Sequence, residues 1–542
     1  MTILSIGQSA LAAAQVGLST TGNNIANAAT PGYSRQVVVQ GAAMAQDFGF
    51  GFLGQGTEIS TVKRIYSEFL GSQVRSAQTS KSGLDSYYAQ IRQIDNLLAD
   101  PAAGLSPALQ GFFSGIQEMS SNPASIPSRQ AALSSAEALA SRFQSLAGRL
   151  KEMEQGVNSQ VTSSVNVINS YGLQIAKLND AIGRVQSANG QPANDLLDQR
   201  DQLILDLNKE VRATVVKQGD GGYNVFIGNG QPLVVGVKAF SLTTATSPTN
   251  PERIEVAYQT ATGPVIVGES SLGGGKHGGL LEFRSKTLEP AQNALGRVAI
   301  GLATTFNTQH KAGFDLNGDP GVDFFKLSQP VANEHSKNTG TADVTASISD
   351  ANALTTSDYT LQYDGTNYTL TRLSDNVKTI FPTLPKTVDG VELKLASGDP
   401  DPGDSFLIRP TVNGASGFAA AITDPKLIAA AAATGAVGDN RNALLLAALQ
   451  TANTLGNGTT SYQGAYSQLV SQIGNKTREL DVTSSAAGML LSEANLSLQT
   501  ESGVNLDEEA TNLLRYQQAY QASGKVMQIA SELFDVLLSI GR

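Results

Sequence analysis

The amino-acid sequence predicts an elongated, multidomain α+β protein in which helices from the two ends of the chain pair in a coiled-coil-like manner. Three observations predict this fold class. Apolar residues recur every seven positions at both ends. Two interior stretches keep the 3/4 spacing of a helical rod, and short strand-like runs between Gly-rich turns fill much of the rest. The 542 residues suffice for several domains of roughly 100–200 residues each.

The N-terminal segment is predicted to be a helix that ends at a turn. A weak heptad, with small residues on the adjoining seam, is formed by Leu4, Leu11, Leu18 and Ile25. Pro31 disfavours helical geometry at Thr30, so the helix should end near residue 28 or 29. Gly32 supplies a turn residue that tolerates positive φ. The strand-like run SRQVVVQ follows at 34–40, and its Arg35 is the first charged side chain of the chain.

The C-terminal segment shows a stronger heptad. One apolar column consists of Leu506, Leu513, Tyr520, Met527 and Phe534, and a second column begins with Tyr516. Asn505 followed by Glu508 reads as an N-cap with a capping box, and acidic residues in the first turn suit the helix dipole. These two ends are therefore predicted to pair with each other, or to become a core only after several subunits assemble, because the small N-terminal seam buries little area.

Helical rods lie inside the ends. Residues 128–185 keep 3/4 apolar spacing and predict a rod on the order of 85 Å long. A second rod is expected at 462–480, continuing toward 498 and packing antiparallel on the first. Shorter helices are predicted at 84–98, from the Ser106-Pro107 pair onward, and at 288–306, 424–433 and 441–449.

The middle of the chain is predicted to be rich in β-structure. Strands are expected at 214–217, 223–227 and 233–237, within a β-rich segment at about 212–285. A hairpin at 359–363 and 368–373 is expected around Asp364-Gly365, with 391–395 and 405–408 extending its sheet. The domains predicted from this pattern are 1–60 with 502–542, 61–340 with 421–501, and an inserted outer β domain at 341–420.

Composition excludes several function classes. The net charge of −10 argues against nucleic-acid binding. Absence of cysteine excludes disulfides and thiol chemistry, and the three histidines are scattered along the chain. No positively charged Sec-type leader and no run of about 18 apolar residues is visible. The protein is therefore expected to have no membrane span, and to be cytoplasmic or exported without a cleaved signal.

Three motifs were weighed for chemistry. The glycines of GFGFLG (49–54) match a dinucleotide fingerprint, but a strand-like run follows, so a turning loop is expected. Asp315, Asn317 and Asp319 open like a calcium loop, but Pro320 and Lys326 stand where Gly and Glu are needed. An Asx turn is expected there. Asp195, Asp198 and Asp201 share one helix face and predict salt bridges near a domain junction. No catalytic residue, metal site or cofactor is expected.

The ends of the chain resemble a known family. NNIANAATPGYSRQ (23–36) resembles the N-terminal signature of bacterial flagellar rod, hook and hook-associated proteins, and SGVNLDEEATNLLRYQQAYQASGKVM (502–527) resembles its C-terminal partner. The residues of the signature turn are Asn23, Asn24, Asn27, Pro31, Gly32 and Tyr33. In the interior, the ordered set IDNLLAD, NDLLDQRDQL, GNGQPLVV, GGLLEFR and DLNGDPGVDFF is similar to the hook-associated protein 1 family.

The resemblance implies a structural subunit of the bacterial flagellum and not an enzyme. It implies a homo-oligomeric ring at the junction of hook and filament, in contact with the hook protein and with a second junction protein on the filament side. It also implies type III export without signal cleavage, an extracellular location, and a dedicated export chaperone at the C-terminal helices. The family architecture implies an inner domain of paired terminal helices, a helical middle domain and an outer β domain.

Two alternatives stay open from the sequence. Another flagellar axial protein (hook, rod or flagellin-like) is disfavoured by the long rod and by the Asn/Pro-Gly signature. A secreted adhesin or enzyme with coiled-coil ends is less favoured still, and a deep cleft with ionisable groups would support it. One further hypothesis concerns the charge-free polar residues before Arg35. They are expected to line a channel through which unfolded chains pass, since an uncharged wall holds neither acidic nor basic cargo.

Overall fold

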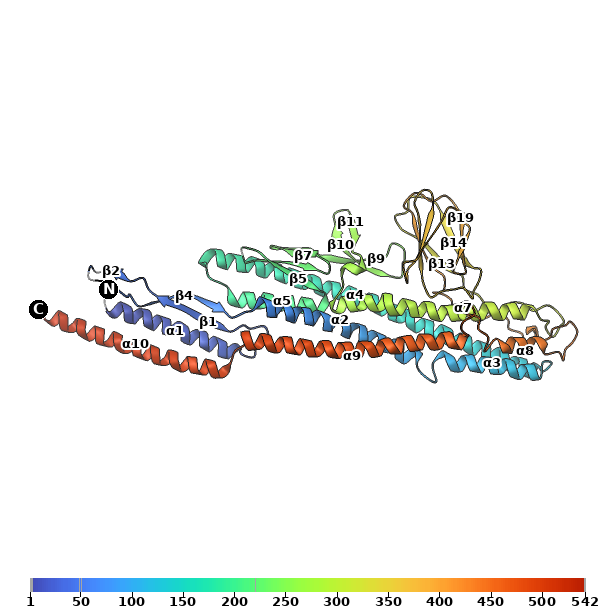
Figure 1. Cartoon of the computed structure of the whole chain (residues 1–542), viewed down its shortest axis with the longest axis horizontal. Coiled ribbons are helices and arrows are strands. Elements are labelled where there is room, and N and C mark those ends of the chain that lie inside the picture. Colours follow the sequence, from blue (N-terminus) through green and yellow to red (C-terminus); the bar gives the residue numbers. More distant parts are fainter. Residues whose placement is uncertain (1–2, 48, 50, 220, 541–542) are drawn as a thin grey trace.

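The structure is a computed structural model that describes residues 3–47, 49, 51–219 and 221–540, and it shows an elongated molecule (Figure 1). The two chain ends lie together at one end of this molecule, and a β-rich region projects from its side near the other end. The predicted multidomain α+β class with long terminal helices is confirmed.

The helices differ widely in length. They are α1 (Ile3–Asn27), α2 (Glu68–Leu98), α3 (Leu105–Ser121), α4 (Ile126–Asn189), α5 (Asn194–Glu210), α6 (Gly275–Phe283), α7 (Glu289–Lys311), α8 (Arg441–Ala448), α9 (Tyr462–Ser502) and α10 (Leu506–Ile540). A π-helical segment, η2 (Arg284–Leu288), joins α6 to α7, and short 3-10 turns are η1 (Glu269–Ser271) and η3 (Pro425–Leu427).

The longest helix, α4, is the predicted rod. Its 64 residues correspond to about 95 Å at 1.5 Å per residue. Ser125 caps its start by accepting a hydrogen bond from the Ser128 N–H, and Gly190 ends it in the left-handed conformation at φ 65°. The helix therefore extends slightly beyond both limits of the predicted 128–185.

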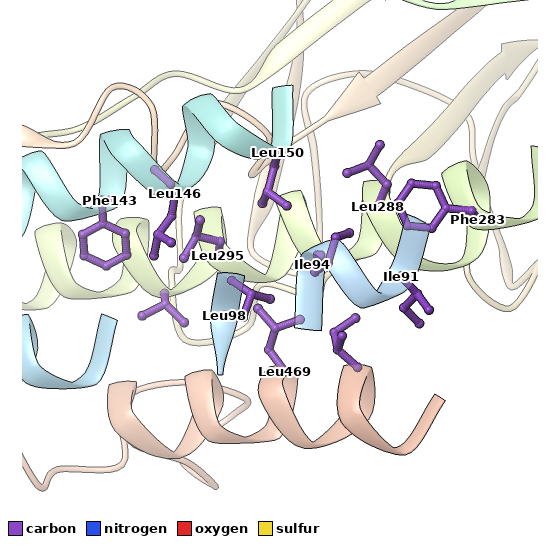
Figure 2. Close-up of a cluster of buried hydrophobic side chains, with 14 of the residues drawn as sticks. Ile91, Ile94, Leu98, Phe143, Leu146, Leu150, Phe283, Leu288, Leu295 and Leu469 are labelled. Carbon is purple, nitrogen blue, oxygen red and sulfur yellow. The ribbon is translucent and has the colours of Figure 1, made fainter. Parts of the chain in front are cut away.

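The second rod has a different partner from the one predicted. α9 packs along α2 and not along α4. The Tyr466 hydroxyl donates to the Leu98 carbonyl at 2.7 Å, and Ser484 donates to Asp85 at 2.6 Å. Because α3, α5 and several strands already cover the apolar stripe of α4, α2 offers the open apolar face. Figure 2 shows Leu469 of α9 beside Leu98 of α2 in the resulting core.

One hydrophobic core runs through the helical body. Figure 2 shows side chains of α2, α4, α7 and α9 meeting there, among them Ile94, Leu146, Leu295 and Leu469. Toward the far end of the molecule the core becomes aromatic, with Phe112, Phe306, Phe324, Phe325 and Phe418 in mutual contact. The most N-terminal residue of this core is Leu84, which packs against it, and the most C-terminal is Leu480.

The strands form small antiparallel sheets. Those before residue 270 are β1 (Gln36–Ala42), β2 (Gln46–Asp47), β3 (Phe52–Leu53), β4 (Thr57–Arg64), β5 (Ala213–Lys217), β6 (Tyr223–Ile227), β7 (Gln231–Val235), β8 (Lys238–Ala239), β9 (Leu242–Thr246), β10 (Ile254–Thr260) and β11 (Gly263–Ile266). β1 pairs with β4, β2 with β3, and two sheets have the orders β5-β6-β7-β8 and β11-β10-β9.

Most of the remaining strands form the side-projecting region. The full set is β12 (Phe325–Lys326), β13 (Val331–Glu334), β14 (Asp343–Ile348), β15 (Tyr359–Tyr363), β16 (Tyr368–Arg372), β17 (Lys378–Phe381), β18 (Lys386–Val388), β19 (Val391–Ser397), β20 (Ser405–Arg409) and β21 (Ala419–Ala420). The exceptions are β12 and β21, which pair with each other against α7 and α4 of the helical body. A five-stranded sheet has the order β13-β20-β15-β16-β17, and a three-stranded sheet has the order β14-β19-β18. The two sheets enclose a second hydrophobic core.

Several local predictions were wrong. Residues 391–395, predicted to extend the hairpin sheet, lie in β19 of the three-stranded sheet. Residues 424–433 form no α-helix beyond the 3-10 turn η3, because Ala431 pairs with Phe314 in an isolated bridge. α3 begins at Leu105 with Gly104 as N-cap, so Ser106 lies inside the helix. The hairpin of β15 and β16 is confirmed, with Gly365 at φ 98° in its turn.

Candidate functional site

The terminal helices α1 and α10 pack against each other through small residues. The residues of α1 that this packing and the adjoining strands bury are Gly7, Ala13, Ala14, Gly17, Thr21 and Asn24. A Cβ at Gly17 would lie 2.5 Å from the Tyr516 ring, and one at Gly7 would lie 2.9 Å from Met527 Cγ. Glycine at both positions therefore permits the close approach of the two helices, because a larger residue would displace the Tyr516 or Met527 side chain.

The structure brings together only part of the predicted pairing set. Tyr516 and Met527 contact the α1 glycines, and Leu11 and Leu18 are half-buried. The other predicted residues remain exposed by 37–58%, namely Leu4, Ile25, Leu506, Leu513, Tyr520 and Phe534. The buried apolar side chains within the described parts of α1 and α10 are Ala13, Ala14 and Ala530. This helix pair alone therefore has almost no hydrophobic core.

The signature turn forms an elbow in which α1 reverses into β1. The Asn24 side chain forms two hydrogen bonds with the backbone of Gln36. Its Nδ2 donates to the Gln36 carbonyl at 2.8 Å, and its Oδ1 accepts from the Gln36 N–H at 2.9 Å. The Tyr33 hydroxyl donates to the same Oδ1 at 2.8 Å. Asn27 donates to the Asn23 carbonyl at 3.0 Å, and Asn23 donates to the Tyr33 hydroxyl at 3.3 Å.

Pro31 and Gly32 form the tip of this elbow. Gly32 has φ 77°, a conformation that strains every other residue. A Cβ at Gly32 would also lie 2.7 Å from Gln202 Oε1 on α5. The signature residues therefore combine a tight turn with a close approach to the helical body.

Helix α5 holds the elbow through its row of acids. The Asp198 carboxylate accepts the Ser34 N–H at 2.9 Å, the Ser34 hydroxyl at 2.8 Å and Arg64 Nη1 at 2.7 Å. Asp201 accepts a hydrogen bond from Arg64 Nη2 at 2.7 Å, and Asp195 accepts one from the side-chain Nε2 of Gln36 at 2.8 Å. The predicted salt bridges are confirmed for Asp198 and Asp201, which both pair with Arg64, whereas Asp195 accepts a neutral amide and forms no ion pair among the described residues. Asp198 is buried, Asp201 is half-buried and Asp195 is exposed, and we call these three carboxylates the acidic anchor.

Arg35 closes the elbow from the other side. Its backbone N–H donates to the carbonyl of Ser502, the last residue of α9, at 2.9 Å. Its guanidinium lies 2.6 Å from Glu508 of α10. Asn505 caps α10 as predicted, by accepting the Asp507 N–H at 3.0 Å. The Glu508 carboxylate forms an ion pair with Arg35 and does not accept the Asn505 N–H. The predicted reciprocal capping box is therefore absent from this helix start.

Burial shapes the electrostatics of the acidic anchor. Burial raises the pKa of Asp198, against hydrogen bonds from Ser34 and Arg64 that lower it. Burial and the Asp195 and Asp198 carboxylates together raise the pKa of Tyr33 to about 12. The Tyr33 hydroxyl therefore stays protonated at every physiological pH and remains a hydrogen-bond donor to Asn24.

The other motifs lie away from this site. Asp315 Oδ1 accepts the N–H groups of Asn317 and Asp319 at 2.8 and 2.9 Å, which confirms the Asx turn. The described residues contain no group of three or more side chains suited to hold a metal ion. The described part of GFGFLG lies in the loop that carries β3, as the predicted turning loop requires.

Sequence reasoning missed the role of three features. The leucine heptad does not indicate the contacts of Gly7 and Gly17, although small residues at close-packed helix positions are a readable signal. Arg64 gave no signal, because its partners lie more than 130 positions away on α5. The acids of α5 were found, but their partners were not.

Comparisons with known proteins place the chain in a family. A model of the flagellar hook-associated protein FlgK helical domain matches residues 91–325, and a model of the flagellar hook-associated protein 1 D2-like domain matches 333–410. Flagellar hook-associated protein 1 of Escherichia coli K12 is 39% identical over 544 residues, covering 99% of each chain. The chain belongs to the flagellar hook-associated protein 1 family.

Further matches agree with membership of the hook-associated protein 1 family. The relative from Bacillus subtilis is 26% identical over 570 residues, covering 99% of this chain and 97% of the other. Rod-protein models match the two ends, at 4–33 and 499–540. The flagellar hook junction protein FlgK from Burkholderia pseudomallei has a TM-score of 0.75 at 30% identity, covering 79% of this chain and all of that one. Among the described helices, none has the length and apolarity needed to cross a membrane.

Proposed function

We propose that this chain is the structural subunit that joins the flagellar hook to the filament, acting outside the cell as an exported component without enzymatic activity. Family membership supports this proposal, and the similar Burkholderia pseudomallei protein is described as a hook junction protein. Another axial protein or a secreted enzyme has no comparable support, since the relatives along the whole chain are hook-associated proteins.

The observation that carries the proposal is the exposed state of the terminal helices. The main core ends at Leu84 and Leu480, and α1 and α10 bury only three alanines as apolar side chains. Large apolar residues such as Leu506 and Phe534 stay more than half exposed. A helix pair of this kind has marginal stability in water by itself. Its exposed apolar residues would therefore become buried only when subunits assemble.

The proposed assembly is a homo-oligomeric ring between the hook protein and a second junction protein. The acidic anchor fixes the elbow to the helical body, so the terminal pair extends from that body in a set direction (Figure 1). A dedicated chaperone would cover the exposed face of α10 before export, because such a face invites aggregation. The predicted domain limits of 1–60 with 502–542, and of 341–420, remain part of this proposal.

The uncharged face of α1 is proposed to line a central channel. Gln8, Gln15, Ser19 and Asn23 are exposed and lie on the side of α1 away from its buried seam. The chain carries no charged side chain before Arg35. Unfolded cargo of either charge would then pass without being held.

Deletion of the gene followed by imaging tests the proposed function. Cells without this chain are expected to assemble hooks but no attached filaments, and plasmid expression should restore them. Imaging of the restored junction should trace this subunit between hook and filament. Filaments attached to hooks in the deletion strain would contradict the proposal and favour a different axial role.

A further inference from the structure

A second apolar seam runs along the C-terminal half of α10. Val526, Ile529, Leu533, Val536 and Ile540 follow one another at alternating spacings of three and four, so they share one helix face. Their exposed fractions range from 39% to 77%. The column that faces α1, which includes Ser523 and Ala530, lies about 100° away around the helix axis. We call these five residues the outer seam.

A second exposed apolar surface lies on the hairpin that follows the elbow. β1 and β4 pair along most of their length, and the short pair of β2 and β3 extends the hairpin. Its exposed apolar side chains are Val37 (38%), Val39 (41%), Met44 (89%), Phe52 (76%) and Leu53 (53%). Between Arg35 and Glu58 the sequence has a single charged residue, Asp47. We call these five residues the hairpin surface.

The two surfaces lie on different sides of α1. The end of the β1–β4 ladder farthest from the elbow packs on α1, where the Thr57 N–H donates to Ser9 Oγ at 3.3 Å and a Cβ at Gly56 would lie 2.4 Å from that Oγ. α10 instead packs on Gly7 and Gly17. Figure 1 shows the hairpin along one side of α1 and α10 along the other. The helix α1 therefore keeps the outer seam and the hairpin surface of one molecule apart.

We infer that the outer seam of one copy packs on the hairpin surface of a second copy. The exposed fractions leave roughly 500 Å² of accessible area on the residues of the outer seam and roughly 600 Å² on those of the hairpin surface, which is the upper end for a patch on a monomer. Together the two surfaces would bury about 1,100 Å², which exceeds the roughly 1,000 Å² that a specific interface needs and lies in the size range of weak interfaces. The residues of both surfaces are apolar, and the charged side chains nearest to them in sequence, Asp47 on the hairpin and Lys525, Glu532 and Asp535 on α10, would lie at the rim of the contact.

This contact is head-to-tail, because each copy offers a different surface to each of its two neighbours. A head-to-tail interface repeats around an axis and generates rings or helical arrays. It thus deepens the proposed function, on whose ring it rests, by naming the surfaces that join neighbours. A single contact of minimal area is weak, whereas in a closed ring every subunit takes part in two such contacts. The protein would stay monomeric when dilute and associate when subunits are delivered to one place.

Cysteine cross-linking in assembled flagella tests this inference, because the chain has no cysteine of its own. Met44→Cys and Ile529→Cys place thiols on the two surfaces at exposed positions, so neither should disturb the fold. Leu53→Cys and Leu533→Cys provide a second pair in case the first lies out of register. Cells would co-express one variant of each kind in a strain without the natural chain, and isolated flagella would be mildly oxidised. A disulfide requires Cα atoms within about 7 Å, so it reports direct contact.

The expected result is a mixed disulfide dimer in flagella that contain both kinds of variant, and a ladder of multimers when one chain carries Met44→Cys and Ile529→Cys together. The matched control, Ile380→Cys with Ile529→Cys, uses a 66% exposed position on β17 and should give no mixed dimer. Same-site dimers alone, cross-links only to another protein, or no cross-link in assembled flagella with either pair would overturn the inference and leave the proposed function standing. A wild-type chain that never enters the junction would instead overturn the proposed function.

Discussion

The substitution Asp198→Asn tests whether the acidic anchor holds the elbow independently of the helical core. The carboxylate accepts the Ser34 N–H, the Ser34 hydroxyl and Arg64 Nη1, and an amide retains only one acceptor oxygen. Hydrogen bonds to a charged group contribute about 1.5–3 kcal/mol each, and breaking a buried ion pair costs about 3–5 kcal/mol. A local cost of about 3 kcal/mol is therefore expected, which is roughly a 150-fold change in the opening equilibrium.

Hydrogen exchange measured by mass spectrometry separates the elbow from the body. Peptides covering residues 34–42 should exchange roughly 100-fold faster in the Asp198→Asn protein, while peptides of α4 should exchange at the wild-type rate. The elbow should open without the helical body, because the main hydrophobic core begins only at Leu84. The assay uses the dilute monomer, in which no neighbour holds the elbow in place.

Asp206→Asn is the matched control, because it makes the same change on the same helix. Asp206 pairs with Lys209 at 2.7 Å, but the two side chains are 24% and 49% exposed. An exposed pair contributes at most about 1 kcal/mol, so exchange at 34–42 should stay near the wild-type rate. Equal acceleration in the elbow and in α4, or no change in the elbow with Asp198→Asn, would refute the reasoning.

Three further substitutions or conditions give separate outcomes. Gly17→Ala should prevent incorporation of the chain into flagella, because its Cβ would lie 2.5 Å from the Tyr516 ring. The control Gly22→Ala should incorporate normally, because no atom lies within 4 Å of a Cβ at that position. Equal incorporation of the two variants would contradict the inference that α1 and α10 pack through small residues. Ser19→Lys should slow filament growth, because it places a charge on the proposed channel wall, while ring assembly stays intact. Filament length over time measures the growth, and unchanged growth would contradict the channel hypothesis. Burial lowers the pKa of His277 and of His310 from 6.5 to about 4. His310 Nε2 also accepts the Ala429 N–H at 2.9 Å, a bond that a proton would break. Between pH 6.5 and 4 the unfolded state binds more protons, so the free energy of unfolding should fall as the pH falls through this window, by up to about 3 kcal/mol per histidine. A free energy of unfolding that stays constant between pH 7 and 4, measured by urea titration, would show that these histidines do not stay neutral in the fold.

The sequence predicted the elements whose signal is local. The heptads, Pro31-Gly32 and the 3/4 spacing of 128–185 each depend on near neighbours, and α1, the elbow and α4 lie where these patterns place them. The hairpin at Asp364-Gly365 belongs to the same group, since its turn chemistry lies within two residues.

The sequence did not predict pairings between distant segments. Whether α9 packs on α2 or on α4 depends on which apolar face the rest of the chain leaves open, and no spacing in α9 carries that information. The alanine-rich stretch 424–433 has helix propensity, but tertiary pairing of Ala431 with Phe314 overrides it. The acids of α5 were recognised as a row, whereas Ser34 and Arg64 are brought to them only by the fold.

The exposed state of the terminal helices has a general consequence for the leucine heptad. Tyr516 and Met527 pack against the glycines of α1, whereas most of the other large heptad residues stay exposed and add little to the α1–α10 pair. These exposed residues are available for contacts with neighbouring subunits in the proposed assembly. The heptad therefore reflects contacts between subunits, and the glycines reflect packing within one subunit.

Protection of the terminal helices before and after assembly tests this account most directly. Amide exchange should be measured for α1 and α10 in dilute monomer and in isolated flagella, with α4 as the internal reference. The account predicts fast exchange of both terminal helices in the monomer, strong protection of both in the flagellum, and protected α4 in both samples. Terminal helices that are as protected as α4 in dilute monomer would contradict the claim that their core forms only on assembly.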